Sequence, residues 1–507
     1  MKNRKLSTIV SLLVLVLQLG VEAATAIIIL RLNMLPDAFT AVFLGLLAVP
    51  ALITALLLFV KNRKGKVSIA RRVIACILAL LVICGCGLVA KLAGDAYDAF
   101  HAVTNTPVTT NVQSMYVLVR VDDPAKSLSD AKDYPYGIIA DYDLLHTQGT
   151  VAYIEEAVGK SVSLTEYESV ILLADGLLSD GVDAAIMNGV TVSLLLEQEG
   201  YEDFTEKVRI LQEIPFTEVE PTTEPTEPTE TQPPVEKTIT NTPFVVYISG
   251  SDTTSSKLNI SRSDVNILMV VNPVTKQVLL LNTPRDYYVP NPAGDGKLDK
   301  LTHCGLYGTD CSMSALSSLY DLTIDYYGQI NFTGFETLVD AIGGITVYAD
   351  ESFKAMGFYI QEGENYLNGE QALKFARDRY HVTGGDRGRG KNQMKVIKAV
   401  IEKMTSGTTI ISNYTQILKS LEGMFSTSLR MEDISMLVKM QLSDMASWNI
   451  QSFSVSGVGG SEKTYSMPGS NAYVMYPDEE QVAYASQLAQ RVLNGEVLTA
   501  EDMKLPN

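Results

Sequence analysis

The chain has 507 residues, a formal net charge of −18, four histidines and five cysteines. A chain of this length is expected to hold two or more domains, and its acidic balance opposes binding to nucleic acid, whose phosphates it would repel. The few histidines, with no Cys/His ligand spacing in the sequence, argue against a zinc site.

Three apolar runs near the N-terminus, at residues 9–30, 38–60 and 73–90, are each long enough, or nearly so, to cross a bilayer as a helix. Glu22 interrupts the first run, and we expect it to face the helix bundle rather than lipid. Lysines and arginines precede the first run and fill the loop between the second and third. Because cytoplasmic loops are enriched in these cations, we predict a cytoplasmic N-terminus and an extracytoplasmic chain after about residue 92. Residues 1–93 are therefore predicted to be a multi-pass anchor in the cell membrane.

Two segments are predicted to connect this anchor to the rest of the chain. Residues 94–217 are predicted to be a small α/β accessory domain, because strand-like runs at 115–121 and 136–140 alternate with a helical segment at 151–158. No catalytic constellation stands out there. Residues 218–237 are rich in proline, threonine and glutamate, which is typical of an extended linker without a core.

Residues 238–495 are predicted to form an α/β/α sandwich, followed by a tail at 496–507. Strand-like runs at 244–249, 265–272 and 276–282 precede alternating helices and strands, and a strongly amphipathic helix is predicted at 393–404. Helices are also expected at 410–424 and 431–445. Cys304 and Cys311 lie in the predicted extracytoplasmic part, where a disulfide is chemically allowed, and whether they form one stays open.

A glycine-rich stretch at residues 384–393 is crowded with charge. In an acidic chain, such a cluster of cations needs an anionic partner, and arginine forks suit phosphate oxygens. Glycines let the backbone approach a ligand, and the helix after Lys391 would direct its N-terminus at the same place. The stretch and the segment before it are therefore predicted to bind an anion through Arg377, Arg379, Arg387 and Arg389.

Charged residues also end the predicted strands. Asp252 follows the first strand, Arg262 and Asp264 precede the second, and Arg285 and Asp286 follow the third. Strand ends are where α/β sheets place ligands, and two carboxylates beside several arginines suit Mg²⁺ and pyrophosphate. No Walker-type loop is present, so a nucleoside triphosphate is not indicated.

Eight stretches in this part of the chain together resemble the LytR-CpsA-Psr family of cell-envelope glycopolymer transferases. The three apolar spans followed by an accessory domain resemble the capsule-associated branch of that family. The matching stretches are RSDVNIL at 262–268, NTPRD at 282–286, KLTHCGLYG at 300–308, IDYY at 324–327, residues 334–344, LNGEQA at 367–372, ARDR at 376–379 and GDRGRGKNQ at 385–393.

The resemblance implies a phosphotransferase that moves a glycopolymer from a polyprenyl-pyrophosphate carrier to peptidoglycan and forms a phosphodiester. The polymer, whether capsule polysaccharide, teichoic acid or another glycan, stays open. By the same resemblance, Mg²⁺ is held by Asp252 and Asp264, and Arg285 is catalytic together with Asp286 or Asp386 as the proton acceptor. The implied pyrophosphate ligands are Arg262, Arg285, Arg377, Arg379, Arg387, Arg389 and Gln393.

Some residues in these motifs have simpler explanations. We expect Asp378 to lie outside the site as an exposed partner of Lys374. Asn392 stands where many family members have a second arginine, which leaves the phosphate cradle open at that position. The apolar stripe from Met394 to Met404 is more often core than the lining of a lipid tunnel.

Other functions fit parts of the sequence. A non-catalytic polyprenyl-lipid-binding protein would keep the binding motifs without turnover, and a pyrophosphatase would use water in place of a sugar hydroxyl. A regulator of the transcription-attenuator type is opposed by the short cytoplasmic segments, which show no helix-turn-helix pattern.

Overall fold

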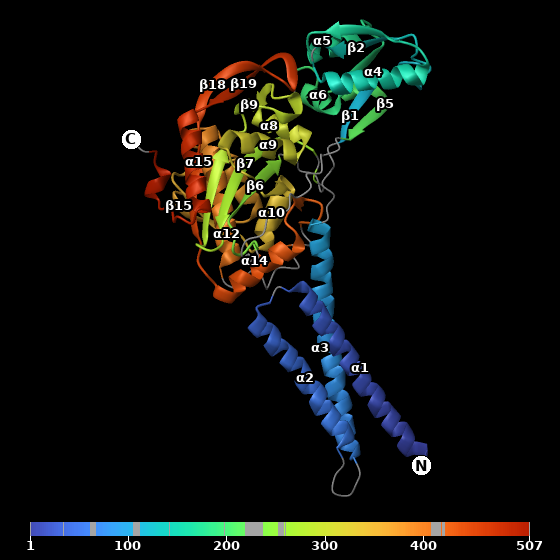
Figure 1. Ribbon diagram of the computed structural model, residues 1–507, viewed down its shortest axis with the longest axis vertical. Coiled ribbons are helices and arrows are strands. Elements are labelled where there is room, and N and C mark those ends of the chain that lie inside the picture. Colours follow the sequence, from blue (N-terminus) through green and yellow to red (C-terminus); the bar gives the residue numbers. More distant parts are fainter. Residues whose placement is uncertain are drawn as a thin grey trace, which may run out of the picture.

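The computed structural model describes residues 2–33, 35–60, 67–104, 112–140, 142–196, 198–217, 237–251, 258, 260–406, 417 and 421–505. A helical stem carries a large α/β unit, and a smaller α/β unit lies beside it at the end far from the N-terminus (Figure 1). The predicted α/β architecture with three N-terminal apolar helices is confirmed. The predicted linker lies outside the described residues apart from Lys237.

The stem consists of α1 (Lys2–Leu32), α2 (Asp37–Phe59) and α3 (Ile69–Thr104). Their apolar spans have mean hydropathies of 2.4, 2.7 and 3.0, so each can cross a membrane by length and composition. Glu22 is 6% exposed and accepts a hydrogen bond of 2.9 Å from the Gln18 amide. Glu22 therefore faces the bundle, as predicted.

The smaller unit contains a five-stranded sheet in the order β3-β2-β4-β1-β5. Strand β2 runs parallel to β3 and β4, whereas β1 runs antiparallel to β4 and β5. Its elements are β1 (Val112–Arg120), β2 (Pro135–Ile139), α4 (Leu144–Val158), β3 (Ser163–Tyr167), α5 (Val170–Leu178), β4 (Ala184–Asn188), α6 (Gly189–Leu195), α7 (Phe204–Lys207) and β5 (Val208–Thr217).

The larger unit is built on a six-stranded mixed sheet in the order β16-β11-β6-β7-β8-β17. Strands β6, β7 and β8 are antiparallel neighbours, while β11 and β17 flank them in parallel with β6 and β8. The strands are β6 (Phe244–Ser251), β7 (Ser263–Asn272), β8 (Gln277–Thr283), β11 (Tyr326–Asn331), β16 (Phe425–Thr427) and β17 (Asn449–Ser454).

Helices cover both faces of this sheet because alternate strand residues point to opposite sides. Val245 and Tyr247 pack in the core that contains α9 (Thr309–Tyr320) and α15 (Glu479–Leu493). Phe244 and Val246 pack on the other side with α12 (Asp386–Thr405) and α14 (Met431–Asp444). The result is the predicted α/β/α sandwich.

Shorter elements surround the sandwich. Strands β18 and β19 form a hairpin along its rim (Figure 1), and α10 and α11 pack together beside α12. These elements are β9 (Tyr288–Pro290), β10 (Leu298–Lys300), α8 (Leu301–Cys304), α10 (Phe332–Ala341), β12 (Ile345–Ala349), β13 (Phe353–Ala355), β14 (Phe358–Ile360), β15 (Gly363–Leu367), α11 (Gly369–Arg377), β18 (Gly457–Thr464) and β19 (Met467–Pro477).

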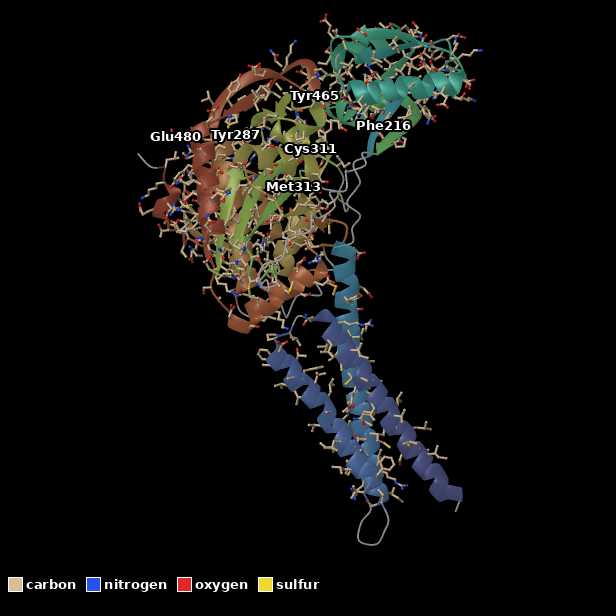
Figure 2. The ribbon with its side chains drawn as sticks, viewed as in Figure 1. Phe216, Tyr287, Cys311, Met313, Tyr465 and Glu480 are labelled. Carbon is tan, nitrogen blue, oxygen red and sulfur yellow. The ribbon has the colours of Figure 1, made fainter. Side chains whose placement is uncertain are left out.

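The two α/β units meet at a tyrosine cluster. The ring of Tyr465 lies 5.1 Å from that of Tyr142 and 6.1 Å from that of Tyr307 (Figure 2). The Tyr142 and Tyr307 hydroxyls are 3.3 Å apart. Since Tyr142 belongs to the smaller unit and the other two to the larger, a single core continues from one unit into the other.

Two further predictions concern cysteines and helix boundaries. Cys304 and Cys311 are both buried, and both are free thiols in this structure. The helix predicted at 393–404 begins earlier, at Asp386, and most of the helix predicted at 410–424 lies outside the described residues.

Candidate active site

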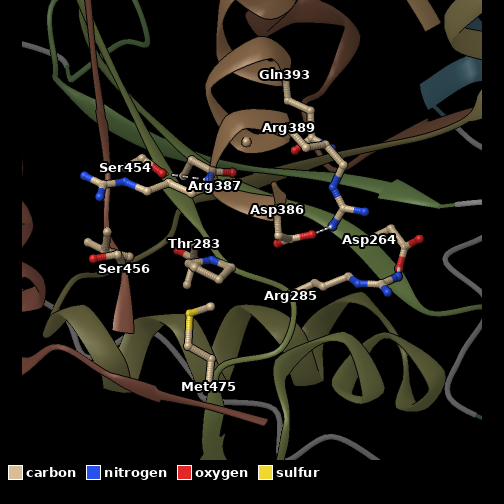
Figure 3. Close-up of a pocket in the computed structure, with 14 residues that line it drawn as sticks. Asp264, Thr283, Arg285, Asp386, Arg387, Arg389, Gln393, Ser454, Ser456 and Met475 are labelled. Atoms are coloured by element: carbon tan, nitrogen blue, oxygen red, sulfur yellow. Dashed lines mark hydrogen bonds and ion pairs between the residues drawn. The ribbon is translucent and has the colours of Figure 1, made fainter. Parts of the chain in front are cut away.

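A cavity of about 390 Å³ lies where β7, β8 and β17 meet the N-terminus of α12 (Figure 3). The register explains this meeting point: Asn266 near the start of β7 pairs with Thr283 at the end of β8, and Ser454 at the end of β17 pairs with Asn282. The cavity is lined by Asp264, Asn282, Thr283, Pro284, Arg285, Asp386, Arg387, Arg389, Gly390, Gln393, Ser454, Val455, Ser456 and Met475.

Glycines allow the first turns of α12 to approach the sheet. Gly384 and Gly385 have φ angles of +89° and +57°, which favour glycine. A Cβ on Gly390 would lie 2.4 Å from Asn282 Nδ2 at the end of β8. The N-cap position is Gly385, which has no side chain to cap the helix, so no N-cap side chain neutralises the positive end of the α12 dipole beside the cavity.

Arg285 links two carboxylates at one side of the cavity. Its Nη1 donates to Asp264 Oδ1 at 2.8 Å, and its Nε lies 3.7 Å from Asp286 Oδ2. Burial acts to lower the pKa of Arg285, but the charges of Asp264 and Asp286 outweigh it and leave the pKa raised. Arg285 is therefore held in its charged form by the protein itself.

Asp286 is buried and also contacts Lys300, whose Nζ forms an ion pair with Asp286 Oδ1. Asp286 is not among the residues lining the cavity. It is thus bound on two sides by cations behind the cavity wall. The sequence did not indicate this role for Lys300, although Lys300 opens one of the motifs quoted above.

Arg389 is different, because its surroundings oppose its charge. It forms an ion pair of 2.6 Å with Asp386, one helical turn earlier. Burial lowers the pKa of the Arg389 guanidinium, and although Asp386 opposes this effect, the nearby charges of Arg285 and Arg379 add to it. The cavity therefore has more positive charge around Arg389 than its carboxylates balance, and a bound anion would restore the balance.

The other predicted arginines divide into two groups. Arg387 lines the cavity together with Gln393, whereas Arg262, Arg377 and Arg379 do not line it. Arg377 instead lines a second cavity, and its guanidinium lies 4.2 Å from the ring centroid of Phe332. Arg379 donates to the Tyr380 hydroxyl at 2.7 Å.

Of the two predicted metal ligands, one lies within the part of the chain that the structure describes. Asp252 lies outside the described residues. Asp264 lines the cavity, and its Oδ2 has no partner within the described part of the chain, since its contacts all use Oδ1. The same part of the chain contains no cluster of three or more His, Cys, Asp or Glu residues that could hold a metal ion. One free carboxylate oxygen beside an arginine-lined cavity fits Mg²⁺, which commonly takes few protein ligands and completes its shell with phosphate and water.

The second cavity has an empty volume of about 560 Å³ and an almost entirely apolar lining. It lies between β6, β11, α10, α11 and α12, and Gln393 lines both cavities. Its lining is Ile248, Gly250, Val265, Ile330, Asn331, Phe332, Phe335, Leu373, Ala376, Arg377, Gln393, Val396 and Ile397. A polar cavity and an apolar cavity therefore adjoin at one side chain.

Asp378 and Asn392, which neighbour the cavity, both lie differently from what their motifs suggested. Asp378 is not an exposed partner of Lys374: it is 3% exposed, and Lys374 pairs with Glu370. Asp378 instead accepts hydrogen bonds from the backbone N–H groups of Tyr380 and His381, so it fixes the turn after α11. Asn392 is also buried and points away from the cavity toward the carbonyl of Phe375.

Most side chains of the apolar stripe on α12 pack in the hydrophobic core, as their helical spacing predicted. Met394 is buried in the sheet core, and Ile401 packs against the same cluster. Val400 and Met404 pack against another core cluster. Ile397 is the one stripe residue in the lining of the apolar cavity.

A buried hydrogen-bond chain connects the smaller unit to the neighbourhood of Lys300. The Tyr307 hydroxyl lies 2.9 Å from Ser466 Oγ, and the Ser466 N–H donates to Asp299 Oδ2 at 3.1 Å. The other oxygen of Asp299 contacts His303 Nδ1 at 2.6 Å and the N–H of Lys300 at 2.8 Å. Burial acts to raise the pKa of Asp299, but His303 and the hydrogen bonds outweigh it and leave the pKa lowered. The peptide that carries Lys300 is therefore fixed by a charged, fully buried side chain.

Sequence reasoning missed the C-terminal wall of the cavity. Ser454 is the last residue of β17, Ser456 lies two residues beyond it, and Met475 lies on β19. These residues join the site because β17 pairs with β8 and because Met475 forms a bridge to Tyr287. No local motif marks them, so only the long-range pairing could have found them.

Comparison with known proteins adds to this geometry. The LytR_cpsA_psr family model matches residues 216–488, more than half of the chain. A polyisoprenyl-teichoic acid–peptidoglycan teichoic acid transferase, TagU from Enterococcus faecalis, is 37% identical over 194 residues, covering 38% of this chain and 63% of TagU. TagU from Bacillus licheniformis is 33% identical over 193 residues, covering 38% of this chain and 62% of TagU. The matched regions are therefore less than two thirds of these relatives' own lengths.

Among solved structures, TagV of B. subtilis is 26% identical, with a TM-score of 0.42, and the match covers 51% of this chain and 99% of TagV.

Proposed function

The chain belongs to the LytR-CpsA-Psr family, and we propose that it is a membrane-anchored phosphotransferase that moves a glycopolymer from a polyprenyl-pyrophosphate carrier to peptidoglycan. The observation that carries the proposal is the junction of two cavities at Gln393, one lined by arginines and the other apolar. A polyprenyl pyrophosphate has the same two parts, a dianionic head and an apolar chain. The names of the TagU relatives favour a teichoic acid as the polymer, while the accessory domain favours a capsule polysaccharide.

The arginine-lined cavity suits the pyrophosphate. The guanidinium groups of Arg285 and Arg389 both lie on the side of Asp386 that faces Asp264 (Figure 3). Guanidinium groups can bind the non-bridging oxygens and stabilise the charge that develops during transfer. Arg387 and the N-terminus of α12 extend the same positive field. Arg262, Arg377 and Arg379 would act around the rim of this cavity rather than within it.

Asp264, with Asp252, would hold Mg²⁺ near these arginines. When bound, the ion supplies charge neutralisation at the phosphate oxygens.

The transfer itself needs one proton acceptor. In the proposed step the acceptor hydroxyl oxygen forms a bond to the phosphorus that carries the glycan. The P–O bond to the lipid-bearing phosphate breaks, and polyprenyl phosphate leaves. Asp386 lines the cavity, whereas Asp286 is held behind its wall by Arg285 and Lys300. We therefore assign the proton of the hydroxyl to Asp386, and a positioning role to Asp286.

The apolar cavity suits the lipid. Its lining side chains come from the sheet and from three helices, and almost all of that lining is apolar. The lipid would enter from the membrane side, where Lys439 on α14 forms an ion pair of 2.7 Å with Asp37 at the start of α2. This contact supports the predicted orientation, in which the α1–α2 connection and the catalytic unit share the extracytoplasmic side.

The test is a transfer reaction with the full chain in detergent. We would supply a polyprenyl-pyrophosphate-linked glycan, peptidoglycan fragments and Mg²⁺, and seek a glycan–phosphate–peptidoglycan adduct by mass spectrometry. The adduct should vanish with Arg389→Gln and with a chelator, and persist with Lys504→Gln, a change at an exposed lysine far along the chain. Free glycan phosphate without adduct would instead indicate a pyrophosphatase, and donor binding without any product would indicate a non-catalytic lipid-binding protein.

A further inference from the structure

The arginine-lined cavity has two ends of different character. Gln393 lies at one end and Met475 at the other, with Asp386 between them (Figure 3). Gln393 also lines the apolar cavity, so the two cavities adjoin at this end. The Met475 end continues into the hairpin formed by β18 and β19, which is fixed to the site because the Met475 N–H donates to the Asp286 carbonyl at 2.7 Å.

Tyr473 stands on this hairpin next to the cavity. It precedes Met475 by two residues on β19, so both side chains lie on the same face of the hairpin, about 7 Å apart along the strand. A Cβ on Gly459 would lie 3.0 Å from Tyr473 Cε2 and 3.0 Å from its hydroxyl oxygen. The tyrosine ring thus rests on the bare backbone of a glycine, and 54% of the residue is exposed to solvent.

Tyr476, on the same hairpin, is also exposed, at 39%, but its ring has partners. Tyr476 lies on the opposite face, packs against Tyr288 with ring centroids 6.1 Å apart, and donates a hydrogen bond to Glu462. For Tyr473, by contrast, no ring contact or hydrogen bond to another described residue is present. A large side chain held against a glycine but not used in packing has one ring face open for a ligand.

We propose that Tyr473 is a stacking platform for the acceptor saccharide of peptidoglycan. This inference rests on the proposed function and assigns the acceptor's place within it. Pyranose rings have an apolar C–H face that packs on aromatic rings, and polar side chains beside the ring meet the sugar hydroxyls. Ser461, which pairs with Tyr473 across the hairpin, and Asn471, two residues before it, supply such groups on the same face.

The geometry of the reaction places the acceptor saccharide, rather than the donor glycan, beside Tyr473. In a phosphoryl transfer the attacking and leaving oxygens lie roughly in line. The leaving group is the lipid-bearing phosphate, whose chain occupies the apolar cavity at the Gln393 end. The attacking hydroxyl must therefore approach from the opposite end, which is the Met475 end, past Asp386 and beside Tyr473.

The test compares Tyr473→Ala and Tyr473→Phe with a matched control in the full chain. Tyr359→Ala is the control, because Tyr359 is also an exposed tyrosine on a short hairpin, 64% exposed, but on β14. We would measure the KM for muramidase-released peptidoglycan fragments, the affinity for the polyprenyl-pyrophosphate donor, and saturation-transfer NMR signals of an N-acetylglucosamine oligosaccharide.

We expect Tyr473→Ala to raise the acceptor KM and to weaken the oligosaccharide signals about tenfold, equivalent to about 1.4 kcal/mol. Donor affinity should not change, and Tyr473→Phe and Tyr359→Ala should behave as the parent protein. A change in donor affinity would place the donor glycan on the hairpin and overturn the acceptor assignment. Unchanged acceptor KM and unchanged oligosaccharide binding would overturn the platform itself. If the parent protein binds the oligosaccharide through Tyr473 but transfers nothing, the proposed function fails while the saccharide platform stands.

Discussion

Two half-buried arginines in the candidate site should respond to the same substitution with very different losses of stability. Arg285 is 19% exposed and Asp264 is 14% exposed in their side chains, and Arg285 also lies near Asp286. Arg285→Gln therefore leaves two carboxylates poorly compensated, at a cost of about 2–3 kcal/mol, below the full cost of breaking a buried pair because solvent still reaches it. For a unit of this size, that cost lowers the Tm by about 4–12 °C.

Arg389→Gln should cost much less. The lost partner, Asp386, has a side chain 32% exposed, so water can replace the ion pair. Burial and two neighbouring arginines also disfavour the charge of Arg389, and its removal relieves both effects. We expect a change in stability within about 1 kcal/mol. Each substitution removes a charge-assisted hydrogen bond to phosphate, so both should weaken pyrophosphate binding by about 10- to 150-fold.

The assay uses the chain's one tryptophan. Trp448 lies in the larger unit, directly before β17, so thermal unfolding followed by its fluorescence reports this unit rather than the smaller one. Binding is measured by titration calorimetry with farnesyl pyrophosphate and Mg²⁺. The reasoning is refuted if Arg285→Gln is as stable as Arg389→Gln, or if Arg389→Gln binds farnesyl pyrophosphate as tightly as the parent protein.

Three further outcomes follow from other parts of the structure. Ala376→Phe places a ring in the apolar cavity and should reduce the affinity for long polyprenyl chains while binding of inorganic pyrophosphate persists; equal loss of both would mean the cavity does not hold the lipid. Tyr142→Phe removes the hydroxyl that accepts from Asn188 and Thr191 within the smaller unit, and it should lower the free energy of unfolding by about 1–3 kcal/mol in urea denaturation; an unchanged free energy would show that these hydrogen bonds do not stabilise the fold. Asp299 has a lowered pKa in the folded state, so its charge stabilises the protein above its unfolded pKa of about 4 and this contribution is lost as the pH falls through the folded pKa. Asp299→Asn should therefore lower the Tm at neutral pH, and the difference from the parent protein should shrink in acid; a constant difference across that range would contradict the role of the charge.

The charged half of the site could be predicted from the sequence because its residues are close along the chain. Asp386, Arg387, Arg389 and Gln393 lie within the first two turns of one helix, so any fold that forms this helix brings them together. Arg285 was recognisable as a charged residue at a strand end. The sheet register then placed that strand end beside the helix.

The start of that helix was predicted seven residues too late, for a physical reason. Gly388 and Gly390 are poor helix formers, which favours a loop in that stretch. The absence of side chains is required by packing, since a Cβ on Gly390 would lie 2.4 Å from Asn282 Nδ2 on β8. Tertiary contact therefore overrides local propensity at this position.

The other half of the site could not be predicted, because it depends on pairing between distant segments. Ser456 and Met475 reach the cavity only after β17 joins the sheet edge and the hairpin bridges to Tyr287. Lys300 belongs to the site because a buried network fixes its backbone, and that network includes residues more than 150 positions away, such as Ser466. Arg377 was assigned to pyrophosphate by its motif, yet the end of α11 directs it over Phe332 in the apolar cavity.

In the proposed transfer, the phosphate that bears the glycan is transferred to peptidoglycan together with the glycan. We would therefore prepare a polyprenyl-pyrophosphate-linked glycan with radioactive phosphorus only in the phosphate that bears the sugar, and incubate it with the full chain, Mg²⁺ and peptidoglycan. We expect the label to become covalently attached to peptidoglycan while unlabelled polyprenyl phosphate is released, and Arg389→Gln to abolish both. Glycan attached to peptidoglycan with all of the label left on the lipid would show cleavage at the sugar carbon instead, and would contradict the account.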